Sequence, residues 1–136
     1  MIDEDKDYKM QQQTREDRRT ILVAGDESTN IQTAEFIMEE EPNHKVIGVS
    51  ETEKVLELLS GGGIDLLLLD DSLPDMDSDE AVSSVIGASQ VPIVYMTSDK
   101  DLETIKKLTQ LGVDDYLTKP FLPMTLKELV HGILNG

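Results

Sequence analysis

The sequence predicts an α/β fold built on one open, doubly wound parallel sheet of five strands with helices on both faces. Short apolar runs alternate five times with segments in which apolar residues recur every three or four positions. The runs ILVA and LLLL are continuously apolar, which is typical of strands buried on both faces. Five such units are too few to close an eight-stranded barrel, so the sheet is expected to be open.

The predicted elements follow one another in strand-then-helix order. Strands are expected at residues 20–24, 45–49, 65–69, 92–96 and 114–117. The apolar helix faces are clearest in three segments, marked by Ile31, Ala34, Ile37 and Met38, by Val55, Leu58 and Leu59, and by Leu126, Leu129, Val130 and Ile133. Ser28 and Asp99 are predicted N-caps of the first and fourth helices. The glycines at 61–63 and Gly112 are predicted to end helices.

Composition excludes several classes of protein. The 136 residues include 28 Asp and Glu against 12 Lys and Arg, for a net charge of −16, which argues against direct nucleic-acid binding. The absence of cysteine excludes disulfides, thiolate zinc sites and cysteine nucleophiles. The longest apolar runs are far shorter than the roughly 20 residues of a membrane-spanning helix. We therefore expect a cytoplasmic protein that does not act at a membrane.

The chain is expected to hold one domain and a tail. Residues 1–18 are rich in charge and glutamine and poor in apolar side chains, so we expect them to form a disordered or weakly ordered tail. Residues 19–136 are expected to form the domain.

Polar residues follow the predicted strands, at the sheet edge where ligands of such folds bind. They are Asp26 and Glu27, Asp70 and Asp71, Thr97 and Ser98, and Lys119 with Pro120. Carboxylates from two strands suit Mg²⁺, and a carboxylate can also attack phosphorus. A lysine and a hydroxyl would then neutralise and bind the phosphoryl oxygens.

Four sequence blocks occur in order: ILVAGDE (21–27), LLLLDDSLPDMDS (66–78), PIVYMTS (92–98) and GVDDYLTKPF (112–121). Together they resemble the signature blocks of the response-regulator receiver domain of two-component signalling. The resemblance implies a flavodoxin-like (βα)5 fold with strand order 2-1-3-4-5. It also implies a regulatory phosphoacceptor domain rather than an enzyme, one that assists its own Mg²⁺-dependent phosphorylation and dephosphorylation.

The resemblance assigns roles to individual residues. Asp70 matches the phosphoacceptor, and Mg²⁺ would be held by Asp26, Asp70 and the backbone carbonyl of Ser72. Thr97 and Lys119 match the groups that contact the phosphoryl oxygens. Thr97 would also act as a switch together with Tyr116, whose ring turns inward, and the bond preceding Pro120 would be cis.

Three positions depart from the family pattern, one of them Ser78, which stands in place of the usual glycine after LPDMD. Gly25 stands where the family has an acid, which predicts weakened Mg²⁺ binding. Asp71 stands where an apolar residue is usual; it either slows attack on an anionic donor or simply faces solvent. A pseudo-receiver that acts as a phosphorylation-independent interaction module is therefore the alternative function.

The resemblance implies partners as well. A sensor histidine kinase or phosphotransfer protein would supply the phosphoryl group, and a downstream effector domain or protein would lie outside this chain. Dimerisation through the fourth helix, fifth strand and fifth helix is a further option. Two rival classes fit less well: GDEST lacks the spacing of haloacid-dehalogenase phosphatases, and Asp26 with Glu27 would repel the phosphate of a flavin.

Overall fold

The structure is a computed structural model that describes residues 18–26, 29–73, 77–99 and 101–135. Apart from Arg18, the tail expected over residues 1–18 lies outside these ranges, as does the predicted N-cap Ser28.

Five parallel strands form one sheet in the order β2-β1-β3-β4-β5, which confirms the predicted fold class and strand order. The strands are β1 (Arg19–Ala24), β2 (His44–Val49), β3 (Leu66–Asp70), β4 (Ile93–Thr97) and β5 (Asp115–Thr118). The helices are α2 (Thr29–Glu39), α3 (Thr52–Ser60), α4 (Ser78–Ala88), α5 (Leu102–Leu111) and α6 (Pro123–Asn135). The fourth and fifth helices of the sequence pattern are thus α5 and α6.

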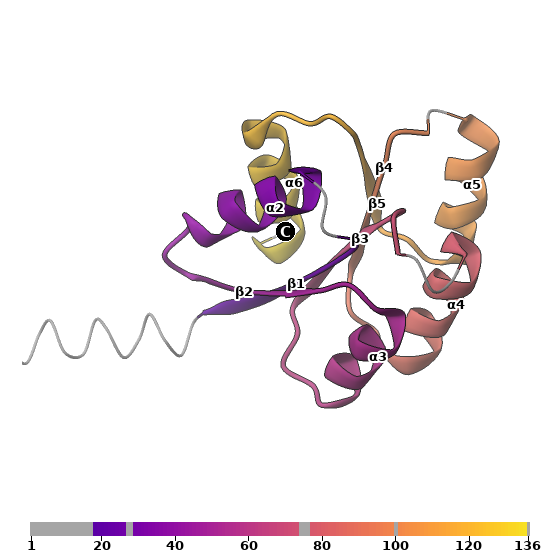
Figure 1. The fold of residues 1–136 in the computed structure, drawn as a ribbon, viewed down its shortest axis with the longest axis horizontal. Coiled ribbons are helices and arrows are strands. Elements are labelled where there is room, and N and C mark those ends of the chain that lie inside the picture. The colour runs from indigo at the N-terminus through magenta and orange to yellow at the C-terminus, as the bar shows by residue number, and fades with distance from the viewer. Residues whose placement is uncertain (1–17, 27–28, 74–76, 100, 136) are drawn as a thin grey trace, which may run out of the picture.

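The helices lie in two layers, one on each face of the sheet (Figure 1). Alternate residues of the central strands pack against opposite layers. Leu67 and Leu69 of β3 pack in the cluster formed with α3, α4 and α5. Leu66 and Leu68 pack in the cluster formed with α2 and α6. Burying one such leucine contributes roughly 2 kcal/mol, so the unbroken LLLL run stabilises both layers at once.

β3, β4 and β5 each begin and end one residue later than the sequence predicted. At the expected starts of β3 and β5 stands an aspartate whose side chain accepts a hydrogen bond from a neighbouring strand. Asp65 accepts a hydrogen bond from the Thr20 amide through Oδ2 at 2.8 Å, and Asp114 accepts one from the Ile93 amide at 2.7 Å. These carboxylates replace a strand carbonyl as acceptor. At the other end of the sheet, Asp70 pairs with Met96 and Thr97 pairs with Thr118, so Asp70 and Thr97 are the last residues of their strands rather than the first residues beyond them.

Helix ends also differ in one place from the prediction. Asp101, not Asp99, is the N-cap of α5, because its Oδ1 accepts from the Glu103 amide at 3.1 Å. Asp99 instead accepts from the Asp101 amide at 2.9 Å and forms the turn before the helix. Gly112 follows α5 with φ 127°, a conformation that only glycine adopts without strain, so its predicted role in ending that helix is confirmed.

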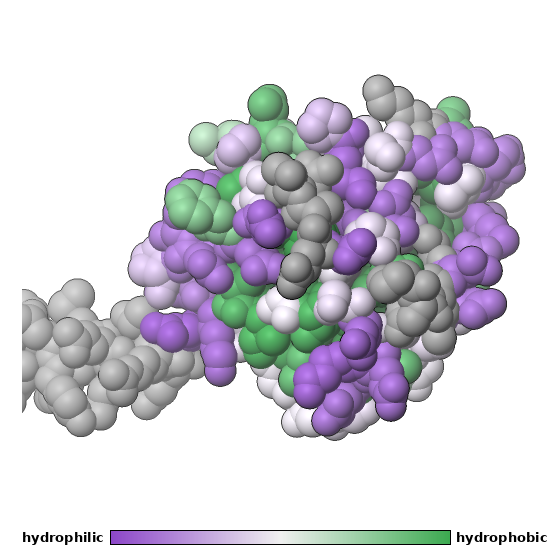
Figure 2. Space-filling view, in the orientation of Figure 1, coloured by the Kyte–Doolittle hydropathy of each residue, from purple (hydrophilic) through white to green (hydrophobic). Residues whose placement is uncertain are grey.

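The surface over α4 and α5 is mostly hydrophilic in Figure 2. Exposed large apolar side chains are scattered over several elements, namely Phe36, Ile86, Leu102, Tyr116, Leu122 and Met124. In the described part of the chain, no helix has the length and apolar character needed to cross a membrane.

Candidate functional site

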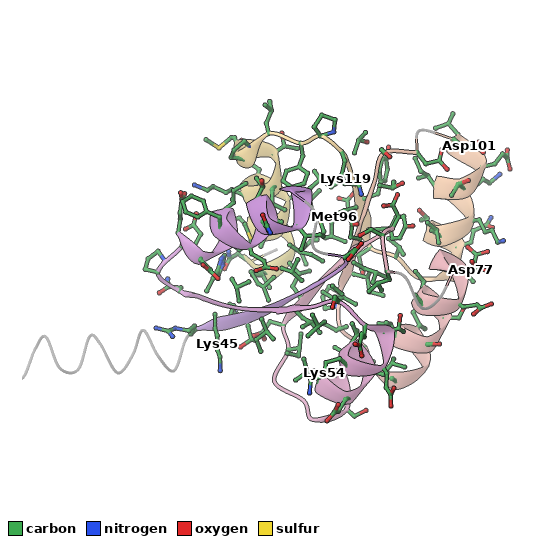
Figure 3. The ribbon with its side chains drawn as sticks, in the orientation of Figure 1. Lys45, Lys54, Asp77, Met96, Asp101 and Lys119 are labelled. Atoms are coloured by element: carbon green, nitrogen blue, oxygen red, sulfur yellow. The ribbon has the colours of Figure 1, made fainter. Side chains whose placement is uncertain are left out.

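The carboxyl ends of β3 and β4 lie side by side, followed by the end of β5. Asp70 pairs in register with Met96, and Thr97 pairs with Thr118. Lys119 directly follows β5, and its amide donates to the Thr97 carbonyl at 2.8 Å. Parallel pairing therefore brings Asp70, Thr97 and Lys119 to the same edge. In Figure 3 Lys119 lies in the middle of the molecule near Met96, whereas Lys45 and Lys54 lie at its periphery.

Lys119 is bound to two adjacent carboxylates. Its Nζ lies 2.9 Å from Asp70 Oδ1 and 2.7 Å from Asp71 Oδ1. The Asp70 side chain is fully buried, and only 11% of the Lys119 side chain is exposed. The ammonium thus offsets the charge of a carboxylate that has no access to bulk water, which is the arrangement that allows a buried anion to persist.

These contacts hold the Lys119 ammonium in its charged form. Burial by itself lowers the pKa of Lys119, but hydrogen bonds and Coulombic attraction from Asp71 and Asp70 outweigh that effect. The net result is a pKa above the ordinary lysine value. Lys119 is therefore a fixed positive charge at the site at neutral pH.

Asp71 does not simply face solvent, which was one of the two interpretations that the sequence left open. Thr97 Oγ1 donates to Asp71 Oδ2 at 2.8 Å, while Asp71 Oδ1 accepts from Lys119. The Asp71 side chain is 27% exposed. Thr97, itself buried, also accepts from the Asp99 amide through Oγ1 at 3.0 Å. Asp71 thus joins the hydroxyl and the lysine in one network.

Sequence reasoning did not foresee that network. The sequence shows that Asp71 adds a negative charge, but nothing in it indicates that this residue binds both Thr97 and Lys119. A usable sign was its position: a second carboxylate beside a buried strand end needs a cation or hydroxyl partner, and both occur after neighbouring strands.

The β1 side of the site is organised around Ser72. The Asp26 amide donates to Ser72 Oγ at 2.9 Å, and the Ser72 amide donates to Asp70 Oδ2 at 3.0 Å. The Asp26 side chain is exposed. These contacts tie the loop after β3 to the end of β1, so the three residues expected to hold a metal are neighbours.

The donors on the β1 side fit Mg²⁺. Two carboxylates and a backbone carbonyl are hard oxygen ligands, and Mg²⁺ needs few of them because it retains several waters. Among the described residues, no three His, Asp or Glu side chains are grouped so as to hold a metal ion. The site would therefore rely on Asp26, Asp70, the Ser72 carbonyl and water.

Gly25 lies close to Asp70, so a side chain at position 25 would crowd it. A Cβ added at Gly25 would lie 2.7 Å from Asp70 Cβ and 2.7 Å from Ile31 Cδ1. The end of the Ile31 side chain can move, but Asp70 Cβ is fixed by its strand. The position at which the family has an acid and this chain has Gly25 is therefore one at which β1 and β3 approach each other closely.

Tyr116 and Pro120 lie beside the network rather than in it. Tyr116 of β5 pairs in register with Tyr95, and it is 41% exposed. The peptide bond between Lys119 and Pro120 is cis, which is the conformation that the resemblance implies.

A hollow of about 1020 Å³ lies at the opposite edge of the sheet, where β1 and β2 begin. Its lining includes Arg19, Glu41, His44, Lys127 and His131. Burial lowers the pKa of His44, and Glu41 offsets part of that effect. None of these side chains belongs to the strand-end network, so the hollow is separate from the candidate site.

Comparison with known proteins identifies the family. The family model for the response regulator receiver domain matches residues 21–131. The alkaline phosphatase synthesis transcriptional regulatory protein PhoP of Bacillus subtilis is 32% identical over 118 residues, which cover 86% of this chain and 49% of that protein. The CAI-1 autoinducer sensor kinase/phosphatase CqsS of Vibrio cholerae is 26% identical over 113 residues, or 80% of this chain and 16% of that protein. The chain thus spans about half or less of these relatives.

Solved structures show the same fold. A two-component response regulator from Clostridium difficile has a TM-score of 0.80 and 26% identity, with 87% of this chain and 97% of that chain covered. The receiver domain of sensor histidine kinase PA1611 from Pseudomonas aeruginosa, solved with a magnesium ion in its active site cleft, has a TM-score of 0.76 and 24% identity, with 88% and 99% covered. Receiver domains are regulatory domains of two-component systems, and phosphorylation on aspartate and Mg²⁺ binding are general features of the family.

Proposed function

Because this chain belongs to the response regulator receiver domain family, we propose that it is a phosphoacceptor signalling domain that receives a phosphoryl group on Asp70. A histidine kinase or a phosphotransfer protein would supply the group. The observation that carries the proposal is the 2.9 Å contact between Lys119 Nζ and Asp70 Oδ1, in a network that also contains Thr97. A buried carboxylate beside an ammonium and a hydroxyl has the partners that a phosphoryl group requires.

The transfer itself needs little from the protein beyond positioning. A carboxylate oxygen of Asp70 attacks the phosphorus of a phosphohistidine or a small phosphodonor. The new O–P bond forms as the bond from phosphorus to the leaving atom breaks, and the leaving group keeps the electron pair and takes up a proton. Lys119 pairs with one phosphoryl oxygen of the resulting acyl phosphate, and the Thr97 hydroxyl donates to another.

Asp26, Asp70 and the Ser72 carbonyl would hold Mg²⁺, which when bound offsets the negative charge shared by Asp70 and the donor. Gly25 supplies no carboxylate to this side. We therefore propose that Mg²⁺ binds more weakly here than at a site with an acid at position 25.

Thr97 also connects the site to the surface. When its hydroxyl turns from Asp71 to the phosphoryl group, the exposed ring of Tyr116 can move into the space that Thr97 leaves. The face formed by α5, β5 and α6 exchanges between two conformations, and phosphorylation changes their populations. That face would bind a downstream effector or a second copy of the domain.

A second candidate function is a pseudo-receiver, which binds partners without being phosphorylated. Two observations favour it. The Asp71 carboxylate is already hydrogen-bonded to Thr97 and Lys119. Gly25 provides no carboxylate on the side of the site where Mg²⁺ would bind. In this role the α5-β5-α6 face would be held in one state.

Phosphorylation assays distinguish the two functions. The protein is incubated with Mg²⁺ and acetyl phosphate, and its intact mass is measured beside that of Asp70→Asn. A mass gain of one phosphoryl group that is absent from Asp70→Asn supports phosphoacceptance. If neither the wild type nor the variants Asp71→Asn and Asp71→Ala gain this mass, the pseudo-receiver is left as the function.

A further inference from the structure

Asp71 binds both side chains that the proposed function assigns to the phosphoryl oxygens. Its Oδ1 lies 2.7 Å from Lys119 Nζ, and its Oδ2 accepts from Thr97 Oγ1 at 2.8 Å. Each carboxylate oxygen therefore engages a different donor. This bridging geometry is that of an anion placed between a lysine and a hydroxyl.

Backbone contacts fix both ends of the bridge. The Asp71 amide donates to the Met96 carbonyl at 3.0 Å, so the residue remains attached to β4 beyond the end of its own strand. The Asp99 amide donates to Thr97 Oγ1 at 3.0 Å and orients the hydroxyl. Because the Thr97 hydroxyl has a single proton, it cannot donate to Asp71 and to a phosphoryl oxygen at the same time.

We propose that Asp71 is a positioning residue that occupies Thr97 and Lys119 in the unphosphorylated protein and so limits how readily Asp70 accepts a phosphoryl group. This inference rests on the proposed function. Lys119 contacts Asp70 as well as Asp71, whereas Thr97 must leave Asp71 to reach the phosphoryl group. The Asp71 carboxylate acts as an internal competitor of the phosphoryl group.

The competition has two physical components. Displacing Asp71 breaks a hydrogen bond to a charged acceptor, which opposes phosphoryl entry. In addition, the carboxylate adds a negative charge in a sparsely hydrated site that an anionic donor must approach. Asn at this position keeps an acceptor for Thr97 but removes the charge, whereas Ala removes both.

The test compares the initial rate of phosphorylation by acetyl phosphate with Mg²⁺ in the full chain and in Asp71→Asn and Asp71→Ala. We expect both variants to be phosphorylated about tenfold faster than the wild type, with Ala at least as fast as Asn. Binding of beryllium fluoride in the presence of Mg²⁺ can be monitored by amide chemical shifts. The beryllium fluoride concentration at the midpoint of this titration should fall by a similar factor. A purely structural role for Asp71 would change thermal stability but not this midpoint.

Asp77→Asn is the matched control. Asp77 precedes α4, is exposed and makes no side-chain capping bond, so its substitution removes the same charge without freeing Thr97 or Lys119. Its rate should stay within about twofold of the wild type. The isosteric Asp71→Asn variant decides the question if Asp71→Ala does not fold.

The outcomes separate the inference from the function on which it rests. Wild-type phosphorylation with Asp71 variants that are no faster overturns the inference and leaves the phosphoacceptor function standing. Absence of phosphorylation in the wild type and in every Asp71 variant overturns the phosphoacceptor function, and the inference with it. Faster modification of the variants, including the case of a nearly inert wild type, supports the inference.

Discussion

The two sides of the strand-end site differ in solvent exposure and in the kind of contact that holds them together. On the β1 side, position 25 has no side chain, the Asp26 side chain is exposed, and Ser72 forms hydrogen bonds with the Asp26 amide and the Asp70 carboxylate. On the β4 and β5 side, Asp71, Thr97 and Lys119 are joined by side-chain contacts of 2.7 and 2.8 Å. The side that would hold a cation is open, and the side that would hold phosphoryl oxygens is closed.

If the proposed function holds, the position of an acid in the site would affect phosphorylation more than the number of acids does. Relative to the family pattern, Gly25 removes one carboxylate from the cation side, and Asp71 adds one beside the lysine and the threonine. The charge near Asp70 is therefore little changed in total. If the proposed function holds, this distribution would disfavour both a bound cation and an incoming phosphoryl group, and so would stabilise the unphosphorylated protein relative to the phosphorylated one.

Lys119→Met should have the largest effect, because Lys119 pairs with carboxylates from both sides of the site. We expect the phosphorylation rate to fall by about 100-fold or more, since the phosphoryl group loses its cation. The free energy of unfolding should fall by about 3 kcal/mol, because Asp70 is left buried without its partner. Acetyl phosphate labelling and urea unfolding measure the two quantities.

Lys107→Met is the control for that variant. Its ion pair with Asp79 joins α5 to α4 between exposed side chains, so its loss should cost at most about 1 kcal/mol. Equal destabilisation by the two substitutions would contradict a special role for the buried pairs of Lys119.

Gly25→Asp and Gly25→Ala separate the steric and the electrostatic consequences of position 25. Both add a Cβ at 2.7 Å from Asp70 Cβ, so both should lower the free energy of unfolding by about 2 kcal/mol. The aspartate alone adds a carboxylate on the cation side, and we expect it to bind Mg²⁺ about tenfold more tightly than the alanine variant does. Calorimetric titration measures this difference, and equal Mg²⁺ affinities would show that Gly25 is not what weakens the site.

Much of this fold could be predicted from the sequence because its signals are local. The continuous apolar runs of β1 and β3 predict strands buried on both faces. The segments between the strands have apolar residues at helical spacing, which predicts helices. The errors are at strand boundaries, where the side chains of Asp65 and Asp114 accept hydrogen bonds from amides of neighbouring strands. Such capping depends on which strands lie side by side, and the local pattern does not contain that information.

The site shows the same division between local and non-local information. The sequence placed Asp70, Thr97 and Lys119 after successive strands, and parallel pairing brings them to one edge. It could not predict the orientation of Asp71 or the close approach of Gly25 to Asp70. Both depend on distances between strands far apart in the chain, where a few tenths of an ångström decide whether a contact forms.

Raising the pH should weaken the closed side of the site, and this is the smallest of the expected effects. The pKa of Lys119 lies above the ordinary value of 10.5, so the folded protein binds this proton more tightly than the unfolded chain. The contribution of the charged Lys119 side chain to the free energy of unfolding is therefore complete below about pH 10.5. It is lost as the pH rises through the higher pKa that Lys119 has in the folded state. Thermal unfolding without Mg²⁺ should show the wild type losing more stability than Lys119→Met above about pH 10.5, with a constant difference below it. Parallel losses in the two proteins across that range would mean that Asp70 and Asp71 do not stabilise the ammonium, and that the network is weaker than its distances imply.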